Sequence, residues 1–226
     1  MLSLQSHTSR TPQPWKNKKG VCYDILTHGE KGAADFWEIG TADLTQDAPF
    51  SDFTGTARQF CVAEGTVQLL IDGRPHFCPV LSVTHFSGAA ETSCMLERGK
   101  GPAKALNLLQ SERAEMKLGM KIVSSSPSSS SSYDEGVDMN SCDLCVVAVG
   151  GAASVSVSCG SRAFAFELSL LDALLWTEEG EGEGEGKGEK RSNAKLVVRS
   201  GSVAIVGQQG ESARDKAFKH ITAHTP

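Results

Sequence analysis

Apolar and polar side chains alternate along much of this chain, which is the period-two pattern of half-buried β-strands. Val67, Leu69 and Ile71 follow this pattern, and the Asp72-Gly73 pair after them is a two-residue hairpin signal. The same alternation, or a short apolar run between glycine-rich turns, predicts further strands over 116–122, 144–149, 155–159, 164–168 and 196–206. No long amphipathic helix pattern is present. We therefore predict an all-β chain built as an antiparallel sandwich or barrel.

Two low-complexity segments interrupt this pattern. Residues 124–132 are eight serines and one proline, and residues 178–190 are a repeat of glutamate and glycine with two lysines. Neither composition can bury apolar surface. The predicted organisation is a flexible N-terminus over 1–13, a first β-module over 14–123, a serine-rich linker over 124–141, a second β-module over 142–207 with a disordered loop over 178–193, and a flexible tail over 208–226.

The 226 residues carry a net charge of −5, and this charge is unevenly distributed. The glutamate-glycine tract contributes −4 and residues 133–177 contribute −5, whereas residues 14–123 sum to −1. A mildly acidic chain is a poor match for a nucleic-acid-binding protein, which usually has a basic excess. No apolar run approaches the roughly 20 residues that a membrane-spanning helix needs. With no hydrophobic stretch of signal-peptide length in the first 13 residues, we predict a cytoplasmic protein without nucleic-acid or membrane partners.

Seven cysteines are scattered through the chain, an odd number in a protein too long to depend on disulfide bonds. Cys142 and Cys145 form a CxxC pair, a spacing that occurs in zinc sites and in redox pairs. A zinc site needs a second pair of ligands, and Cys159 is the only thiol nearby. We interpret the cysteines as reduced thiols of an intracellular protein.

Metal and nucleophile motifs are missing from the sequence. The six histidines never occur as HxH, and HxxxH occurs only as His220 and His224 in the predicted tail. There is no GxSxG motif, and no glycine-rich loop ends in GK[ST]. We therefore predict no metal, no cofactor and no catalytic triad.

One cluster near the start of the first module has the composition of an anion site. Trp15, Lys16 and Asn17 combine an apolar wall, a cation and a directional amide, which together suit a small carboxylate. The alternative interpretation is that Trp15 fills the core and the lysines form a solvated turn.

Three further polar residues stand in or beside apolar runs. Arg58 precedes the run 60–63, where an arginine forms either an ion pair at the rim or a fork for a carboxylate. Asn107 lies inside an apolar run, where a buried amide needs partners. His85, between Thr84 and Phe86, is either a structural residue or a ligand contact.

These segments in this order resemble the HutD/Ves family. The resemblance rests on PWKNKKGVCYDI, DFWEIGTADL, APFSDFTGTAR, FCVAEGTVQLLIDG and FSGAAETSCMLERGKGPAKALNLL. It covers about 14–123 well and the second half loosely, through CVVAVGGAASVSV and LSLLDALLW. It implies a bicupin of RmlC-like type, two double-stranded β-helix modules in tandem without the usual metal ligands.

The resemblance also implies site residues and a role. The family's motif positions fall on Trp15, Lys16, Asn17, Arg58, Glu64 and Asn107. The family is associated with histidine utilisation and is thought to bind a small anionic metabolite. This chain departs from the family pattern at Lys18 and Lys19, at Cys22 and Asp24, at Ala57, and at Ala105-Leu106. Two acidic residues are thereby lost and two lysines are gained, so we expect either a more positive pocket or the loss of the ancestral ligand.

Three functions remain open from the sequence. The first is non-catalytic or regulatory binding of a small anionic metabolite, with Trp15, Lys16, Asn17, Arg58, Glu64, His85 and Asn107 as ligand-binding residues and a homodimer as the oligomer considered. The second is a metal-independent isomerase or hydrolase, which needs a general base in the pocket from Glu64, His76 or His85. The third is an interaction protein or scaffold that acts through the low-complexity segments.

Overall fold

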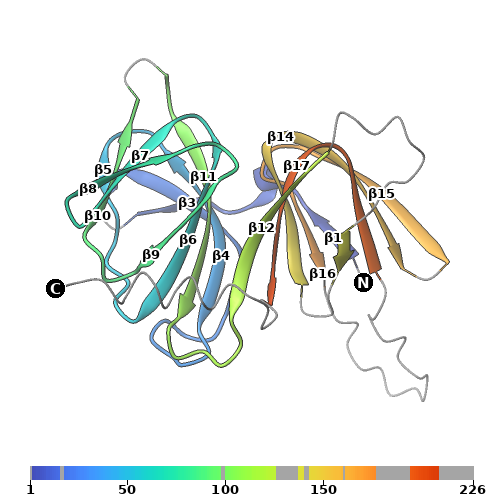
Figure 1. The fold of residues 1–226 in the computed structure, drawn as a ribbon, viewed down its shortest axis with the longest axis horizontal. Helices are drawn as coiled ribbons and strands as arrows, with labels where there is room; N and C mark the ends of the chain where they lie inside the picture. The colour runs from blue at the N-terminus through green and yellow to red at the C-terminus, as the bar shows by residue number, and fades with distance from the viewer. Residues whose placement is uncertain are drawn as a thin grey trace.

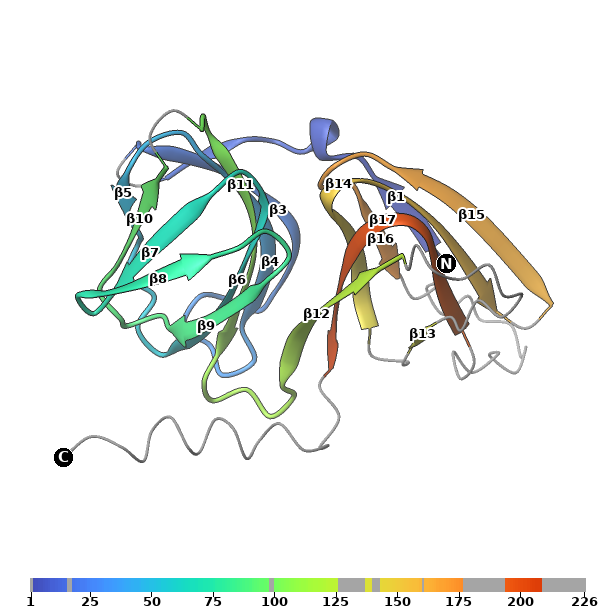
Figure 2. The ribbon, with the colours of Figure 1, turned by 45° about the horizontal axis from the view of Figure 1, so that its top comes forward.

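A computed structural model describes residues 2–15, 18–97, 100–125, 137–139, 143–159, 161–176 and 194–208. Its only helical element in these ranges is the single 3-10 turn η1 (His7–Ser9), and the rest of the regular structure is β-strand. None of its helices is long and apolar enough to span a membrane. Figures 1 and 2 show two β-modules that lie side by side. The all-β prediction is confirmed.

The first module is a pair of facing antiparallel sheets. The six-stranded sheet runs β2 (Gln13–Pro14), β3 (Gly20–His28), β4 (Trp37–Leu44), β11 (Ala103–Ser111), β6 (Thr56–Glu64) and β9 (Val83–Ser87). The four-stranded sheet runs β5 (Ala48–Pro49), β10 (Thr92–Leu96), β7 (Val67–Ile71) and β8 (Arg74–Cys78). The predicted hairpin after residue 71 joins β7 to β8, with Asp72 and Gly73 both at positive φ. Apolar side chains from both sheets, among them Leu44, Phe60, Val62, Leu69 and Cys94, fill the space between them.

The second module is one seven-stranded sheet. Its strands are β1 (Leu2–Gln5), β16 (Ala173–Trp176), β14 (Asp143–Cys159), β17 (Ala194–Gln208), β12 (Leu118–Ser124), β13 (Val137–Met139) and β15 (Arg162–Leu168). The long strands β14 and β17 pair with each other, and their register shifts between Val149 and Ser154. Gly150, Gly151 and Gly201 adopt positive φ at this irregularity, which other residues reach only with strain. Both halves of β14 and β17 contribute side chains to one apolar cluster, so the sheet bends over its own core.

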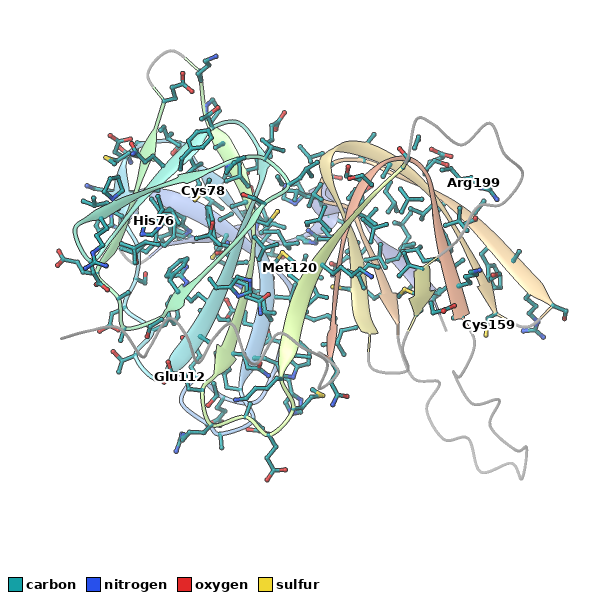
Figure 3. The ribbon with its side chains drawn as sticks, viewed as in Figure 1. His76, Cys78, Glu112, Met120, Cys159 and Arg199 are labelled. Atoms are coloured by element: carbon teal, nitrogen blue, oxygen red, sulfur yellow. The ribbon has the colours of Figure 1, made fainter. Side chains whose placement is uncertain are left out.

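A third apolar cluster joins the two modules. It combines Ile39, Cys61 and Leu108 from the first module with Leu118 and other residues of the second, and Figure 3 shows Met120 at this junction. Strand alternation explains the arrangement, because residues of β4, β6 and β11 that point away from the first core point towards the second module. The modules therefore share a dry interface.

Two glutamine side chains of the first module bond to the backbone of β12. Gln59 donates from Nε2 to the carbonyl of Leu118 at 3.1 Å, and its Oε1 accepts from the Met120 N–H at 2.8 Å. Gln110 donates to the carbonyl of Met116 at 2.5 Å and accepts from the Leu118 N–H at 2.9 Å. These amides satisfy backbone groups on the side of β12 that faces the first module, in place of another strand.

Replacing Gln59 by leucine is expected to lower the free energy of unfolding by about 2 kcal/mol, because the Leu118 carbonyl and the Met120 N–H would lose their partners at a buried junction. Urea denaturation followed by circular dichroism measures this loss. The matched control is Gln68→Leu on the exposed side of β7, with an expected change within about 0.5 kcal/mol. Equal stabilities of the two variants would contradict the role of Gln59.

The structure corrects three predicted boundaries. The N-terminus is not a flexible extension, since Leu2–Gln5 is β1 and pairs with β16 in the second sheet. β12 was predicted within the first module, but it pairs with β17 and belongs to the second. Within the predicted linker, Val137–Met139 also pairs with β17. Pairing partners lie far apart in the chain, so local composition does not identify them. Residues 177–193 and 209–226, which hold most of the predicted loop and tail, lie outside the described residues.

Candidate functional site

The first module holds a cavity of about 280 Å³ at one end of its apolar core. Strands β3, β4, β6 and β11 provide one wall, and the segments around Trp15 and Phe50 provide the other. The residues that line it include Gln13, Trp15, Cys22, Asp24, Lys31, Glu38, Thr41, Phe50, Phe53, Arg58 and Asn107.

Arg58 is the buried cation of this cavity, with 8 % of its surface exposed. Its guanidinium carbon lies over the rings of Phe50 at 4.8 Å, Phe86 at 5.2 Å and Phe53 at 5.5 Å. Burial lowers the pKa of Arg58 to about 10, an effect that the Glu38 carboxylate partly opposes, so the side chain is cationic at neutral pH. Its Nε is buried without a hydrogen-bond partner among the described residues. A buried cation left without a counter-ion is costly, and an anion in the cavity would offset that cost.

Asn107 adds a buried acceptor to the same wall. It lies in β11 opposite Gly40 and Phe60, and its Oδ1 has no hydrogen-bond partner among the described residues. Buried amide oxygens are normally paired, so this atom is suited to an N–H or O–H donor of a ligand. The hydroxyl of Thr41 is likewise unpaired. Strand alternation, however, places its side chain on the opposite face of β4 from Gly40, towards the junction between modules.

Acidic side chains in the cavity already have partners. Glu38 forms an ion pair with Lys31 at 3.0 Å, and Asp24 accepts a hydrogen bond from the Gln13 amide at 3.0 Å. The Lys31 ammonium also lies 5.2 Å from the Phe53 ring. The described wall carries two cations, Arg58 and Lys31, and two carboxylates, Glu38 and Asp24, so their formal charges cancel. The electrostatic potential at Arg58 therefore depends on where these groups lie and not on their net charge. Lys18 and Lys19, predicted at the pocket edge, do not line the cavity.

The structure brings together only part of the predicted site. Trp15, Arg58 and Asn107 line one cavity, and Lys16 and Asn17 lie outside the described residues. The other two predicted residues, Glu64 and His85, lie away from this cavity.

Glu64 and His85 are exposed and do not line the cavity. Glu64 is the last residue of β6, beyond a register shift, where it lies opposite Lys104. His85 is in β9 beside Phe86, and the alternation of the strand turns it away from the core that Phe86 enters. Motif position and sequence neighbourhood did not reveal these orientations.

Several residues of the cavity were missed from the sequence. Lys31 and Glu38 were not selected because their ion pair joins a residue of the loop between β3 and β4 to a residue of β4, a contact that no local sequence pattern shows. Phe50 and Phe53 were quoted in the segment APFSDFTGTAR but were not assigned to the site. The spacing of these two rings ahead of Arg58 was the available signal, since aromatic faces are regular neighbours of buried arginine.

The ionisable groups of the described wall offer little for acid-base chemistry. Glu38 and Asp24 are already engaged, and burial, with Asp24 and Glu38 nearby, raises the pKa of the Cys22 thiol. His76, the remaining candidate base, is exposed on β8 and does not line the cavity. In the described part of the chain, no three His, Cys, Asp or Glu side chains gather where they could hold a metal ion.

The described cysteines are all free thiols. Cys61, Cys78, Cys94 and Cys145 are buried, and burial raises the pKa of Cys61 to about 12. Cys142, the other half of the predicted CxxC pair, lies outside the described residues. Within those residues, cysteine therefore acts as a small apolar side chain.

Comparison with solved structures places this geometry in a known fold. HutD from Pseudomonas fluorescens SBW25, solved in a formate condition, covers 93 % of this chain and 100 % of its own, with a TM-score of 0.64 and 22 % identity. A conserved protein of unknown function from Pseudomonas aeruginosa PAO1 has the same coverage, with a TM-score of 0.67 and 21 % identity. The predicted cupin-type fold is confirmed.

Sequence comparison adds the family. An uncharacterised 21.2 kDa protein of Pseudomonas putida, from the hutC 3′ region, is 36 % identical over 90 residues. That alignment spans 38 % of this chain and 47 % of the relative, about half of its length. The HutD family model matches residues 7–193, a range that contains the cavity and most of both modules. This chain belongs to the HutD family, as its sequence motifs predict.

Proposed function

We propose that this protein binds a small anionic metabolite in the cavity of its first module and acts as a non-catalytic or regulatory binding protein. The observation that carries the proposal is Arg58, a buried guanidinium at the wall of a cavity, whose Nε has no hydrogen-bond partner and which forms no direct ion pair among the described residues. An unpaired buried charge is costly to the fold, and a bound anion would offset that cost.

The shape and chemistry of the cavity limit the ligand. A volume of about 280 Å³ lies just under the usual range for drug-sized ligands, which favours a metabolite of a few carbon atoms. Its carboxylate would accept hydrogen bonds from Arg58, as guanidinium forks favour. A donor group on the ligand would reach the unpaired Oδ1 of Asn107, and the rings of Phe50 and Trp15 would cover its apolar part.

Histidine catabolism is the metabolic context that we propose. The Pseudomonas putida relative is named for the hutC 3′ region, and the Pseudomonas fluorescens structure is named HutD. The formate condition of that structure makes formate, the smallest carboxylate, the natural first ligand to test. Binding without turnover is favoured over metal-independent catalysis because Glu64, His76 and His85 do not line the cavity.

A thermal-shift and calorimetry screen tests the proposal. The full chain is titrated with formate, urocanate, and formylated and formimino amino acids, with formamide and acetamide as uncharged controls. A carboxylate at about 100 times its Kd should stabilise the fold by about 2.7 kcal/mol and raise the Tm by about 5 to 10 °C. The uncharged controls should leave the Tm unchanged.

Two outcomes would count against the proposal. Failure of every carboxylate to bind would exclude anionic metabolites of this class, and equal binding of the uncharged controls would exclude a charge-based site. NMR spectra of each bound ligand after prolonged incubation separate the alternatives further. Conversion of the ligand to a product would favour the metal-independent enzyme over the binding protein.

A further inference from the structure

β15 is an edge strand with an open side. Residues Arg162–Leu168 pair with β14 over all seven positions without a register shift, and no other described strand pairs with β15. Figures 1 and 2 show β15 as the outermost strand of the second sheet, on the side away from the first module. Figure 3 places Cys159, the last residue of β14, at the outer end of the same hairpin. About half of the N–H and C=O groups of β15 therefore point away from β14.

This edge lacks most of the features that usually prevent strands from associating, and its two charged residues, Arg162 and Glu167, lie at or near its ends. Edge strands commonly carry a proline, a lysine or a bulge, or are very short. The sequence RAFAFEL of β15 has no proline or lysine, and its pairing with β14 is regular. By contrast, β8 at the edge of the four-stranded sheet contains Pro75. The open edge of β15 is therefore available to pair with another strand.

An apolar layer extends from the second core to this edge. Leu168, Phe166 and Phe164 lie on one face of β15 because of strand alternation. Leu168 is buried, Phe166 is half-buried against the second core, and Phe164 is 46 % exposed. The opposite face carries Ala163, Ala165 and Glu167, and two of these three are small enough for close approach of another strand.

We propose that β15 pairs antiparallel with β15 of a second copy of this chain, about a two-fold axis at Ala165. In this register Phe164 of each copy lies opposite Phe166 of the other, a cross-strand aromatic pair that covers the exposed ring. Arg162 then lies opposite Leu168, and Glu167 lies opposite Ala163, so no like charges face each other. The sequence of β15 is therefore complementary to itself in this register.

The size of the contact determines the strength of the dimer. Seven residues at roughly 3.3 Å each form an edge of about 23 Å, and pairing of two such edges buries less than the roughly 1,600 Å² of a standard interface. We expect a reversible dimer with a Kd of about 10 to 100 µM. Dimerisation joins the second sheets of two copies into one continuous sheet and leaves the cavity of each first module accessible.

Sedimentation velocity on the full chain, from about one-tenth of that Kd to about ten times it, tests the dimer. The wild type should change from monomer to dimer across this range. Phe164→Lys should remain monomeric, because an ammonium would replace the ring that pairs with Phe166 of the second copy. Phe77→Lys is the matched control, since Phe77 is 67 % exposed on β8 of the first module, and it should dimerise like the wild type. Circular dichroism verifies that both variants are folded.

Cysteine cross-linking tests the register. At the two-fold axis, the Cα atoms of residue 165 in the two copies lie about 4.5 to 5.5 Å apart, within disulfide reach. Residue 163 of one copy is four positions out of register with residue 163 of the other, about 13 Å away. Mild oxidation should therefore link Ala165→Cys into a covalent dimer and should not link Ala163→Cys beyond the wild-type background. A monomer at all concentrations, dimerisation of Phe164→Lys, or equal cross-linking of the two cysteine variants would each overturn the proposal.

Discussion

Replacing Arg58 by methionine is expected to weaken binding of small carboxylates at least about 100-fold while leaving the ligand-free protein as stable as the wild type, or more stable. The guanidinium is buried among Phe50, Phe53 and Phe86 without a direct ion pair in the described residues. Methionine fills a similar volume without a charge to desolvate. Loss of the cation–π contacts costs about 1 to 2 kcal/mol, and removal of the desolvation cost offsets this loss.

Isothermal titration with the carboxylate that binds the wild type most tightly measures the first effect, and urea denaturation measures the second. Arg58→Lys keeps the charge but loses the planar fork, so we expect an affinity loss of about 10-fold. Arg74→Met, at an exposed arginine of β8, should bind like the wild type. Wild-type affinity in Arg58→Met would place the ligand elsewhere, and a large loss of stability would show that Arg58 is a structural residue.

Replacing Asp172 by alanine is expected to lower the free energy of unfolding by about 4 kcal/mol. Asp172 is buried, and its Oδ1 accepts from the His7 N–H at 2.7 Å and the Ser6 hydroxyl at 3.1 Å. Its Oδ2 accepts from the Ser169 N–H at 3.0 Å. Burial lowers the pKa of the Arg10 guanidinium, and the Asp172 carboxylate partly opposes this shift. Asp172 therefore stabilises the charged form of Arg10. Removing Asp172 takes away the acceptor of the His7 and Ser169 N–H groups, one of the two partners of the Ser6 hydroxyl, and the carboxylate charge that supports Arg10.

Urea denaturation measures the loss, and limited proteolysis shows whether the N-terminal segment is released. Asp172→Asn keeps the acceptor Oδ1 but not the charge, so its stability should be intermediate. Asp138→Ala, at an exposed aspartate of β13, should change stability by no more than about 0.5 kcal/mol. If Asp172→Ala were as stable as Asp138→Ala, the N-terminal segment would contribute little to the second module.

The contacts of Asp172 also show why the N-terminus was mispredicted. Residues 1–13 have a polar, serine- and threonine-rich composition that is typical of a flexible end. Residues 2–13 are ordered because β1 pairs with β16 and because Asp172, about 165 positions later, accepts two hydrogen bonds from Ser6 and His7. No local property of the first residues predicts an acceptor so distant in the chain.

The strand predicted over 116–122 is present as β12 (Leu118–Ser124), but it was assigned to the wrong module. Its alternation predicts a half-buried strand whichever sheet it joins. Its place was decided by β17 on one side and by the amides of Gln59 and Gln110 on the other. Nothing in the sequence marks these two glutamines. A glutamine exposed to solvent and a glutamine whose amide bonds to a neighbouring strand are the same residue type.

The period-two alternation, hairpin signals and family motifs were sufficient to predict an all-β, cupin-type fold and to select Trp15, Arg58 and Asn107, which line one cavity. These properties belong to single residues or to short stretches, so they can be read directly from the chain. Only the tertiary structure decided which sheet β1 and β12 join, that Lys31 pairs with Glu38, and that Glu64 and His85 face away from the cavity. Burial and strand pairing depend on contacts between distant segments, and it is burial that distinguishes Arg58 from an ordinary exposed arginine.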